Sequence, residues 1–165
     1  MVYALSYVLY IKLFIEKITY INANLRDLGR VFLRILVVDD DPGTLNAVKV
    51  GLLSKGYEVF IAGSGEEALK IIEAMQAKSE PLDLLLTDLR MPKMSGLKLI
   101  KSARKLRPDI KAIIMTAYGD DNVQKKARAL GQCGYMDKPF RPDALIKMVL
   151  TLEKDGDIEG LRIEN

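Results

Sequence analysis

Histidine and tryptophan are absent from this 165-residue chain, and cysteine occurs once, at Cys133. Without histidine, imidazole catalysis and histidine-based metal sites are excluded, so chemistry must come from carboxylates, lysine, hydroxyls or a bound cation. One cysteine cannot form an internal disulfide, which fits a reducing, cytoplasmic setting. The formal net charge is only +3, and the basic residues are scattered along the chain. We therefore expect no direct contact with nucleic acid, whose readers usually show a basic stripe.

Residues 1–21 are rich in apolar and aromatic side chains, but charges interrupt them at Lys12, Glu16 and Lys17. A membrane span needs roughly 20 predominantly apolar residues. A basic start and a small-residue cleavage site are also missing, which argues against a signal peptide. We interpret residues 1–32 either as an extension that forms an amphipathic helix or as the product of a misassigned start. Such a helix could pack on the domain, pair with a second chain or lie on a membrane surface, although we do not expect membrane contact.

From Arg34 onward, short apolar runs alternate with segments of helical periodicity, which is typical of an α/β fold with a parallel sheet. The first run, 35–38, is apolar without alternation, as expected for a strand covered on both faces. The predicted strands are 35–38, 57–62, 83–88, 110–116 and 133–137. The predicted helices begin near Pro42, Ser64, Ser95, Asp120 and Pro142, with the side chains of Ser64 and Ser95 as helix caps. The pattern predicts one domain at 33–153, a doubly wound five-stranded parallel sheet flanked by five helices, with a flexible tail at 154–165.

Acidic, hydroxyl and basic residues stand where four of these strands end. They are Asp39, Asp40 and Asp41 after the first strand, Asp88 at the third, Thr116 at the fourth and Lys138 after the fifth. In open parallel sheets, ligands bind beyond the carboxyl ends of the strands, so these residues should share one site. An aspartate run after a strand is often only a turn and a helix cap. The functional interpretation therefore depends on all of these residues falling at the ends of strands in one alternating strand–helix pattern.

Clustered carboxylates repel one another and raise each other's pKa unless a cation is present. Their hard oxygens favour Mg²⁺, which takes one or two carboxylates plus phosphate oxygens and keeps several waters. Lys138 offers a fixed positive charge for a phosphoryl group, and the Thr116 hydroxyl offers a hydrogen bond. The pattern therefore predicts in-line phosphoryl transfer to a carboxylate in the presence of Mg²⁺.

Four segments of the chain resemble the signature segments of response-regulator receiver domains, which belong to two-component signalling and to the CheY-like superfamily. They read ILVVDDDPG, LLLTDLRMPKMSGL, IIMTAYGD and GYMDKPF, in the expected order and spacing. The resemblance covers Arg34 to about Glu153 and indicates a stand-alone, single-domain receiver. It implies the flavodoxin-like strand order 2-1-3-4-5.

The resemblance assigns a role to each residue of the predicted site. It implies that Asp88 is the phosphoacceptor, that Thr116 and Lys138 hold the phosphoryl oxygens, and that Tyr135 changes rotamer with Thr116. The implied Mg²⁺ ligands are Asp40, Asp88 and the backbone carbonyl of Arg90, while Asp39 acts on the cation mainly through water. It further implies a cis bond between Lys138 and Pro139. Outside this set, we interpret Asp41 as a helix cap and Met91, Pro92, Gly96 and Phe140 as structural.

Two bulky residues beside the site are predicted to tune kinetics. Arg90 stands two positions after Asp88, and Tyr118 stands two positions after Thr116. Both can obstruct the water that hydrolyses an acyl phosphate, so we expect a comparatively long-lived phosphorylated state.

The resemblance implies a signalling phosphoprotein that is not an enzyme acting on external substrates. A sensor histidine kinase or a histidine phosphotransfer protein would supply the phosphoryl group, since this chain has no histidine. Phosphorylation would reshape the surface formed by the predicted helix at 120–130, the strand at 133–137 and the last helix. The expected readout is a downstream protein effector, a phosphorelay step or a homodimer.

Three rival functions fit this sequence less well. A flavin- or nucleotide-binding module needs phosphate-cradling glycines or hydroxyls after the first strand, where this chain has three aspartates. An aspartate-based phosphatase needs an insertion that encloses its substrate, and the connections here are too short. A receiver-like module that binds partners without phosphorylation is the remaining alternative, and the complete set of site residues argues against it.

Overall fold

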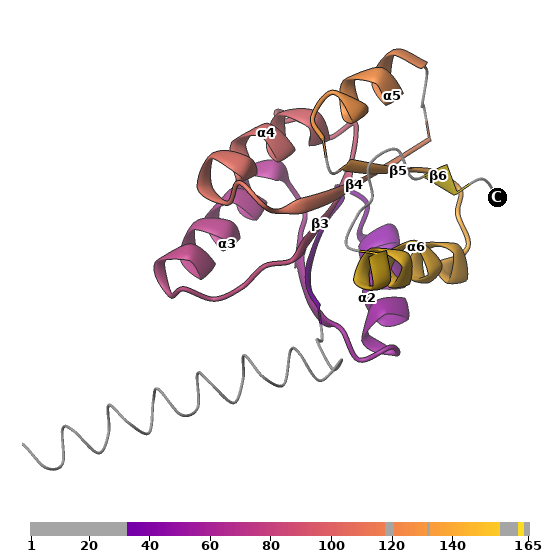
Figure 1. Ribbon diagram of the computed structural model, residues 1–165, viewed down its shortest axis with the longest axis horizontal. Coiled ribbons are helices and arrows are strands. Elements are labelled where there is room, and N and C mark those ends of the chain that lie inside the picture. The colour runs from indigo at the N-terminus through magenta and orange to yellow at the C-terminus, as the bar shows by residue number, and fades with distance from the viewer. Residues whose placement is uncertain (1–32, 118–120, 132, 156–161, 164–165) are drawn as a thin grey trace, which may run out of the picture. The chain divides into compact units, whose positions relative to one another are not determined.

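The computed structural model describes residues 33–117, 121–131, 133–155 and 162–163, all within the unit Leu33–Asn165. Its strands are β1 (Arg34–Val38), β2 (Glu58–Ala62), β3 (Leu84–Asp88), β4 (Lys111–Thr116), β5 (Cys133–Asp137) and β6 (Arg162–Ile163). Its helices are α2 (Pro42–Leu53), α3 (Gly65–Ala77), α4 (Gly96–Leu106), α5 (Asp121–Arg128) and α6 (Pro142–Asp155) (Figure 1). The proposed N-terminal extension and Tyr118 lie outside the described residues.

The strands form one parallel sheet in the order β2-β1-β3-β4-β5-β6. This confirms the predicted order 2-1-3-4-5 and the five flanking helices of the predicted fold. The sixth strand differs from the sequence-based expectation, because it lies in the segment 154–165 that was expected to be flexible. A strand of two residues has no periodicity that a sequence pattern can reveal, whereas its backbone pairing with β5 is clear in the structure.

Side chains that were predicted from the sequence to cap helices do so. Asp41 accepts hydrogen bonds from the backbone N–H groups of Gly43 and Thr44 at the start of α2. Ser64 and Ser95 cap α3 and α4 in the same way. These bonds satisfy N–H groups that have no partner within the helix, so they fix where each helix begins after its strand.

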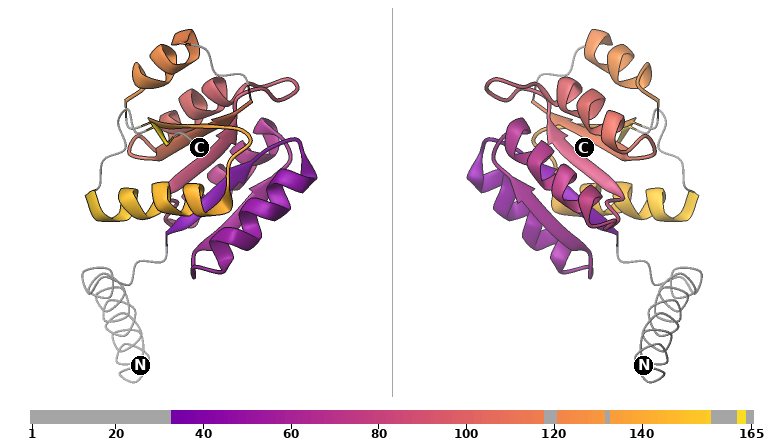
Figure 2. Two further views of the ribbon diagram at one scale, coloured as in Figure 1. Left: turned by 90° about the vertical axis from the view of Figure 1, so that its right-hand side faces the viewer. Right: turned by 90° about the vertical axis from the view of Figure 1, so that its left-hand side faces the viewer.

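The core consists of two layers, one on each face of the sheet. Helices α3, α4 and α5 cover one face, where residues such as Leu36, Leu85 and Ile114 are buried. Helices α2 and α6 cover the other face, where Ile35, Leu86 and their neighbours are buried (Figure 2). Every residue of β3 is buried, because helices cover both faces of this central strand. No helix in the described part of the chain has the length and hydropathy of a membrane span.

Candidate functional site

Three charged residues from separate segments meet where β1, β3 and β5 end. Asp39 directly follows β1, Asp88 is the last residue of β3, and Lys138 directly follows β5. The two carboxylates come from neighbouring strands, because β1 pairs with β3. Both are largely removed from solvent, with 1% of Asp39 and 8% of Asp88 exposed.

The side chain of Lys138 joins the two carboxylates. Its Nζ lies 2.6 Å from Oδ2 of Asp39 and 2.6 Å from Oδ1 of Asp88. Such short, charge-assisted hydrogen bonds are among the strongest in proteins. The structure therefore brings together Asp88, Lys138 and Asp39, three of the residues that the sequence predicted for a single site.

Backbone groups bind the other oxygen of each carboxylate. The N–H of Asp41 donates to Oδ1 of Asp39 over 3.0 Å, and the N–H of Arg90 donates to Oδ2 of Asp88 over 2.6 Å. Each buried carboxylate thus has a partner for both oxygens, as the cost of burying a charge requires. These bonds also fix the direction in which each carboxylate faces the site.

Burial and neighbouring charges act in opposite directions on the pKa values of Asp39 and Lys138. Burial raises the pKa of Asp39 above its ordinary value, and the hydrogen bonds from Lys138 and Asp41 offset only part of that effect. Burial alone would lower the pKa of Lys138, but the hydrogen bonds and negative charges of Asp39 and Asp88 outweigh it, so this pKa is raised. Lys138 is therefore held firmly in its charged form.

The other predicted site residues lie around this centre. Asp40 is exposed at the rim, next in sequence to buried Asp39, and Arg90 is exposed just beyond Asp88. Thr116 is buried at the end of β4, one residue beyond Met115, which is the residue in register with Asp88. The backbone N–H of Lys138 donates to the carbonyl of Thr116 over 2.7 Å, so β4 and the lysine segment are joined directly. The predicted cis bond between Lys138 and Pro139 is present.

Gly96 lies directly against the backbone of Asp88, a contact that the sequence did not reveal. A Cβ on this residue would lie 2.2 Å from the carbonyl oxygen of Asp88, which is an impossible contact. Its backbone N–H donates to the carbonyl of Leu89, and the N–H of Leu89 donates to Met115 of β4. The loop after Asp88 is thus pressed against the start of α4, and only glycine fits there. The sequence indicated a structural role for Gly96, but the close contact exists only in three dimensions.

Tyr135, the predicted switch aromatic, is 5% exposed and packs in the layer of the core under α3, α4 and α5. It lies on β5 in register with Ile114 of β4, two residues before Thr116. This buried position is the inward arrangement that the resemblance associates with the switch.

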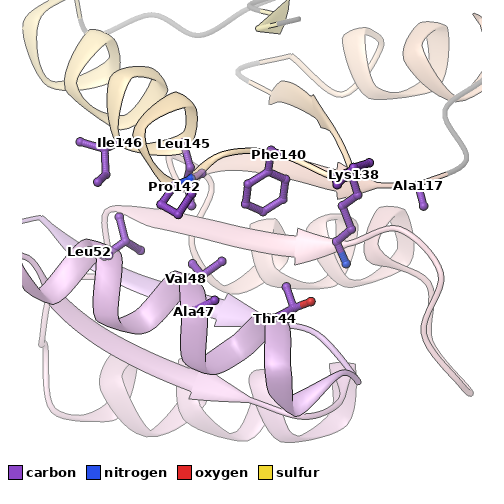
Figure 3. Close-up of a pocket in the computed structure, with 12 residues that line it drawn as sticks. Thr44, Ala47, Val48, Leu52, Ala117, Lys138, Phe140, Pro142, Leu145 and Ile146 are labelled. Atoms are coloured by element: carbon purple, nitrogen blue, oxygen red, sulfur yellow. The ribbon is translucent and has the colours of Figure 1, made fainter. Parts of the chain in front are cut away.

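An apolar pocket of about 320 Å³ lies between α2 and α6 and extends to Lys138 (Figure 3). Thr44 and Val48 of α2 line one side, while Phe140 and Leu145 line the other. Phe140 is partly buried against the core layer of α2 and α6, consistent with the predicted anchoring of the last helix. Lys138 lines this pocket, while its amine is bound to the carboxylates of Asp39 and Asp88.

Within the described residues, no three acidic or sulfur-bearing side chains gather as a ready-made metal cage. Mg²⁺ does not require one, because it is usually bound by one or two carboxylates plus waters and phosphate oxygens. The buried carboxylates of Asp39 and Asp88, with Asp40 at the rim, supply the hard oxygen ligands that this cation prefers. The donor set therefore fits a partly hydrated Mg²⁺.

Known proteins are similar to this chain over most of its length. A family model described as the response regulator receiver domain matches residues 35–150. The chain is 33% identical over 125 residues to sporulation initiation phosphotransferase F of Bacillus subtilis (strain 168), covering 74% of this chain and 97% of that protein. It is 36% identical over 115 residues to the transcriptional regulatory protein GlrR of Escherichia coli (strain K12), covering 70% of this chain but only 25% of that longer protein.

Solved structures give the same result. The chain is similar to a CheY-like response regulator receiver domain protein from Methanospirillum hungatei JF-1, with a TM-score of 0.68 and 34% identity. The match covers 76% of this chain and 96% of that one. The shared region corresponds to the unit of the sheet and its helices described above.

Proposed function

Since this chain belongs to the response regulator receiver domain family, we propose that it receives a phosphoryl group on Asp88 and thereby switches its affinity for a partner. Receiver domains are signalling domains rather than classical enzymes. The observation that supports the proposal most strongly is the Lys138 ammonium bound 2.6 Å from the carboxylates of both Asp39 and Asp88.

In the proposed reaction, Oδ1 or Oδ2 of Asp88 attacks the phosphorus atom of a phosphohistidine donor, and the bond from phosphorus to the donor nitrogen breaks. The N–H of Arg90 holds Asp88 in a fixed orientation for an in-line approach. Lys138 then neutralises negative charge on the transferred phosphoryl oxygens, and the Thr116 hydroxyl donates a hydrogen bond to one of them. Catalysis by such a site depends mainly on positioning and electrostatics.

We propose that Mg²⁺ is the cofactor, held by Asp39, Asp40, Asp88 and the backbone carbonyl of Arg90. When bound, it would supply positive charge that offsets the repulsion between the carboxylates and the incoming phosphoryl group. The chain's own contribution is the fixed direction of the carboxylates, since each buried one is oriented by backbone N–H bonds.

The output is proposed to come from the surface of α5, β5 and α6, through Thr116 and Tyr135. We describe the switch as a shift in the populations of two arrangements, one of which has Tyr135 packed inward as in the structure. Phosphorylation would draw Thr116 toward the phosphoryl group and so favour the inward position of Tyr135. The proposed partners are a sensor histidine kinase or histidine phosphotransfer protein as donor and a downstream protein as effector.

Intact-mass measurement tests the phosphorylation directly. The full chain is incubated with Mg²⁺ and acetyl phosphate, beside an Asp88→Asn variant and a sample without Mg²⁺. We expect one added phosphoryl group in the first sample and none in the other two. Folded protein that gains no mass in any condition would reject the proposal in favour of a partner-binding module that does not depend on phosphorylation.

Arg90 and Tyr118 are proposed to slow hydrolysis of the phosphorylated form. Arg90 is exposed beside Asp88, where its side chain can restrict the approach of water. We expect an Arg90→Ala, Tyr118→Ala variant to lose its phosphoryl group roughly tenfold faster, which corresponds to about 1.4 kcal/mol in barrier height. Mass spectrometry after removal of the donor measures the rate, and a variant as slow as the wild type would refute this role.

A further inference from the structure

The edge of the sheet beside the site is covered by a strand from the C-terminal segment. β5 pairs with β4 along one side, and β6 pairs with Tyr135 and Met136 along the other side (Figure 1). Without β6, this side of β5 would present free backbone donors and acceptors, which readily accept another strand. A pairing of two residues contributes few hydrogen bonds, so such a strand is well suited to exchange on and off the edge.

The backbone of Tyr135 faces this added strand. In a β-strand, the N–H and C=O groups of successive residues point to opposite edges. The N–H of Lys138 donates to Thr116 of β4, so Met136 also faces β4 and Tyr135 faces β6. Tyr135 thus has its side chain in the core and its main chain at the β6 edge.

In the structure, the buried side chain of Tyr135 and the docked β6 occur together. The residue whose side chain would change rotamer, Tyr135, is also the residue whose main chain pairs with β6. We propose that β6 is an exchangeable strand that docks in cis on the β5 edge when Tyr135 is packed inward, and that phosphorylation of Asp88 strengthens this docking. The coupling to phosphorylation rests on the proposed function, whereas the docking itself does not.

Docking of β6 makes the C-terminal segment a second readout of the switch. With the segment docked, the β5 edge is closed to any other strand. With the segment released, the same edge is open to an extended partner peptide, which would bind by adding a strand. The chain therefore carries its own competitor for that edge.

Amide hydrogen exchange of the full-length chain, followed by NMR, tests the docking. An Ile163→Pro variant removes a backbone donor from β6, while the matched Ile163→Ala variant retains it. We expect the Tyr135 amide to exchange at least about tenfold faster in the proline variant than in the alanine variant. Amides of Leu36 and Leu85 report on the remainder of the fold and should be unchanged. Equal exchange of Tyr135 in the two variants would overturn the docking.

The same measurement with Mg²⁺ and acetyl phosphate tests the coupling. We expect exchange of Tyr135 to slow by several-fold in the wild type and to remain fast in the proline variant. An intact-mass measurement on each sample separates the two possible failures. Unchanged exchange in protein that carries a phosphoryl group overturns the coupling alone, while absence of the phosphoryl group overturns the proposed function as well. Protection lost on dilution would assign the strand to a second copy and overturn docking in cis.

Discussion

At the scale of single residues, Asp39 is a carboxylate whose ionised form is disfavoured by burial. It is 1% exposed, it faces the negative charge of Asp88, and its burial raises its pKa. A raised pKa means that folding disfavours the ionised carboxylate, so stability associated with this group falls as pH rises through the folded-state value. Retaining a charged residue at such a position is typical of functional sites.

We expect an Asp39→Asn variant to be more stable than the wild type in the absence of Mg²⁺. Neutralising the side chain removes its desolvation penalty and its repulsion with Asp88, at the loss of a charged partner for Lys138. The expected gain is roughly 1 kcal/mol, the usual size of a single stabilising change. Thermal unfolding with and without Mg²⁺ measures it, and added Mg²⁺ should stabilise the wild type more than the variant. A lower melting temperature for the variant without Mg²⁺ would contradict this account.

Residue positions at the strand ends were predictable, because strand runs and polar termini are both visible in the sequence. Asp39, Asp88 and Lys138 were predicted to share one site, and the structure brings them within hydrogen-bond distance. The position of Tyr135 was not predictable in the same way. Whether an aromatic side chain is packed inward depends on the balance of two arrangements, and a sequence pattern does not contain that balance.

At the scale of elements, the junction between β3 and α4 depends on Gly96. We expect Gly96→Ala to destabilise the protein by at least about 1–3 kcal/mol, because the new Cβ overlaps the carbonyl oxygen of Asp88. Urea unfolding measures the loss. Phosphorylation of Asp88 should also slow, since the loop that orients its carboxylate must move.

Gly51 supplies the matched control. It lies within α2, where an added Cβ would meet only the Cβ of Pro142, at an ordinary 3.7 Å. Alanine is the better helix former, so Gly51→Ala should stabilise the protein by about 0.5–1 kcal/mol. Two glycine-to-alanine changes with opposite signs would locate the effect in the contact at Asp88. Destabilisation of similar size in both would assign it to a general intolerance of substitution.

The elements themselves followed from the sequence to within a few residues. Asp41, Ser64 and Ser95 were predicted to cap helices because their side chains compete for backbone N–H groups locally. β6 and the Gly96 contact were not foreseen. The β6 pairing joins residues 27 positions apart, and the Gly96 contact depends on the exact path of the loop that follows Asp88. Neither periodicity nor local propensity records such contacts.

At the scale of the whole described unit, two core layers share one sheet. Ile113 and Ile114 are adjacent in β4 and are both fully buried, yet Ile113 belongs to the layer under α2 and α6 and Ile114 to the opposite layer. Strands that contribute to both layers should make them unfold together.

We expect Ile113→Val and Ile114→Val each to cost about 0.5–1.5 kcal/mol, and the double variant to cost roughly the sum. Urea unfolding followed by circular dichroism and by tyrosine fluorescence should give coincident transitions in all three variants. Two separate transitions, with one variant affecting only one of them, would show that the layers unfold independently.

The balance of charge around Lys138 affects how strongly the site would bind a cation. Two buried carboxylates, Asp39 and Asp88, bind a single ammonium group, and Asp40 follows next in sequence, so the site already has more negative than positive charge. Attaching a phosphoryl group to Asp88 deepens that deficit, and the affinity for a divalent cation should therefore rise on phosphorylation. Because such coupling is reciprocal, the free concentration of that cation sets how much of the modified protein exists at equilibrium. Under the proposed function, phosphorylation and cation binding would thus act on the same pair of carboxylates and the same amine.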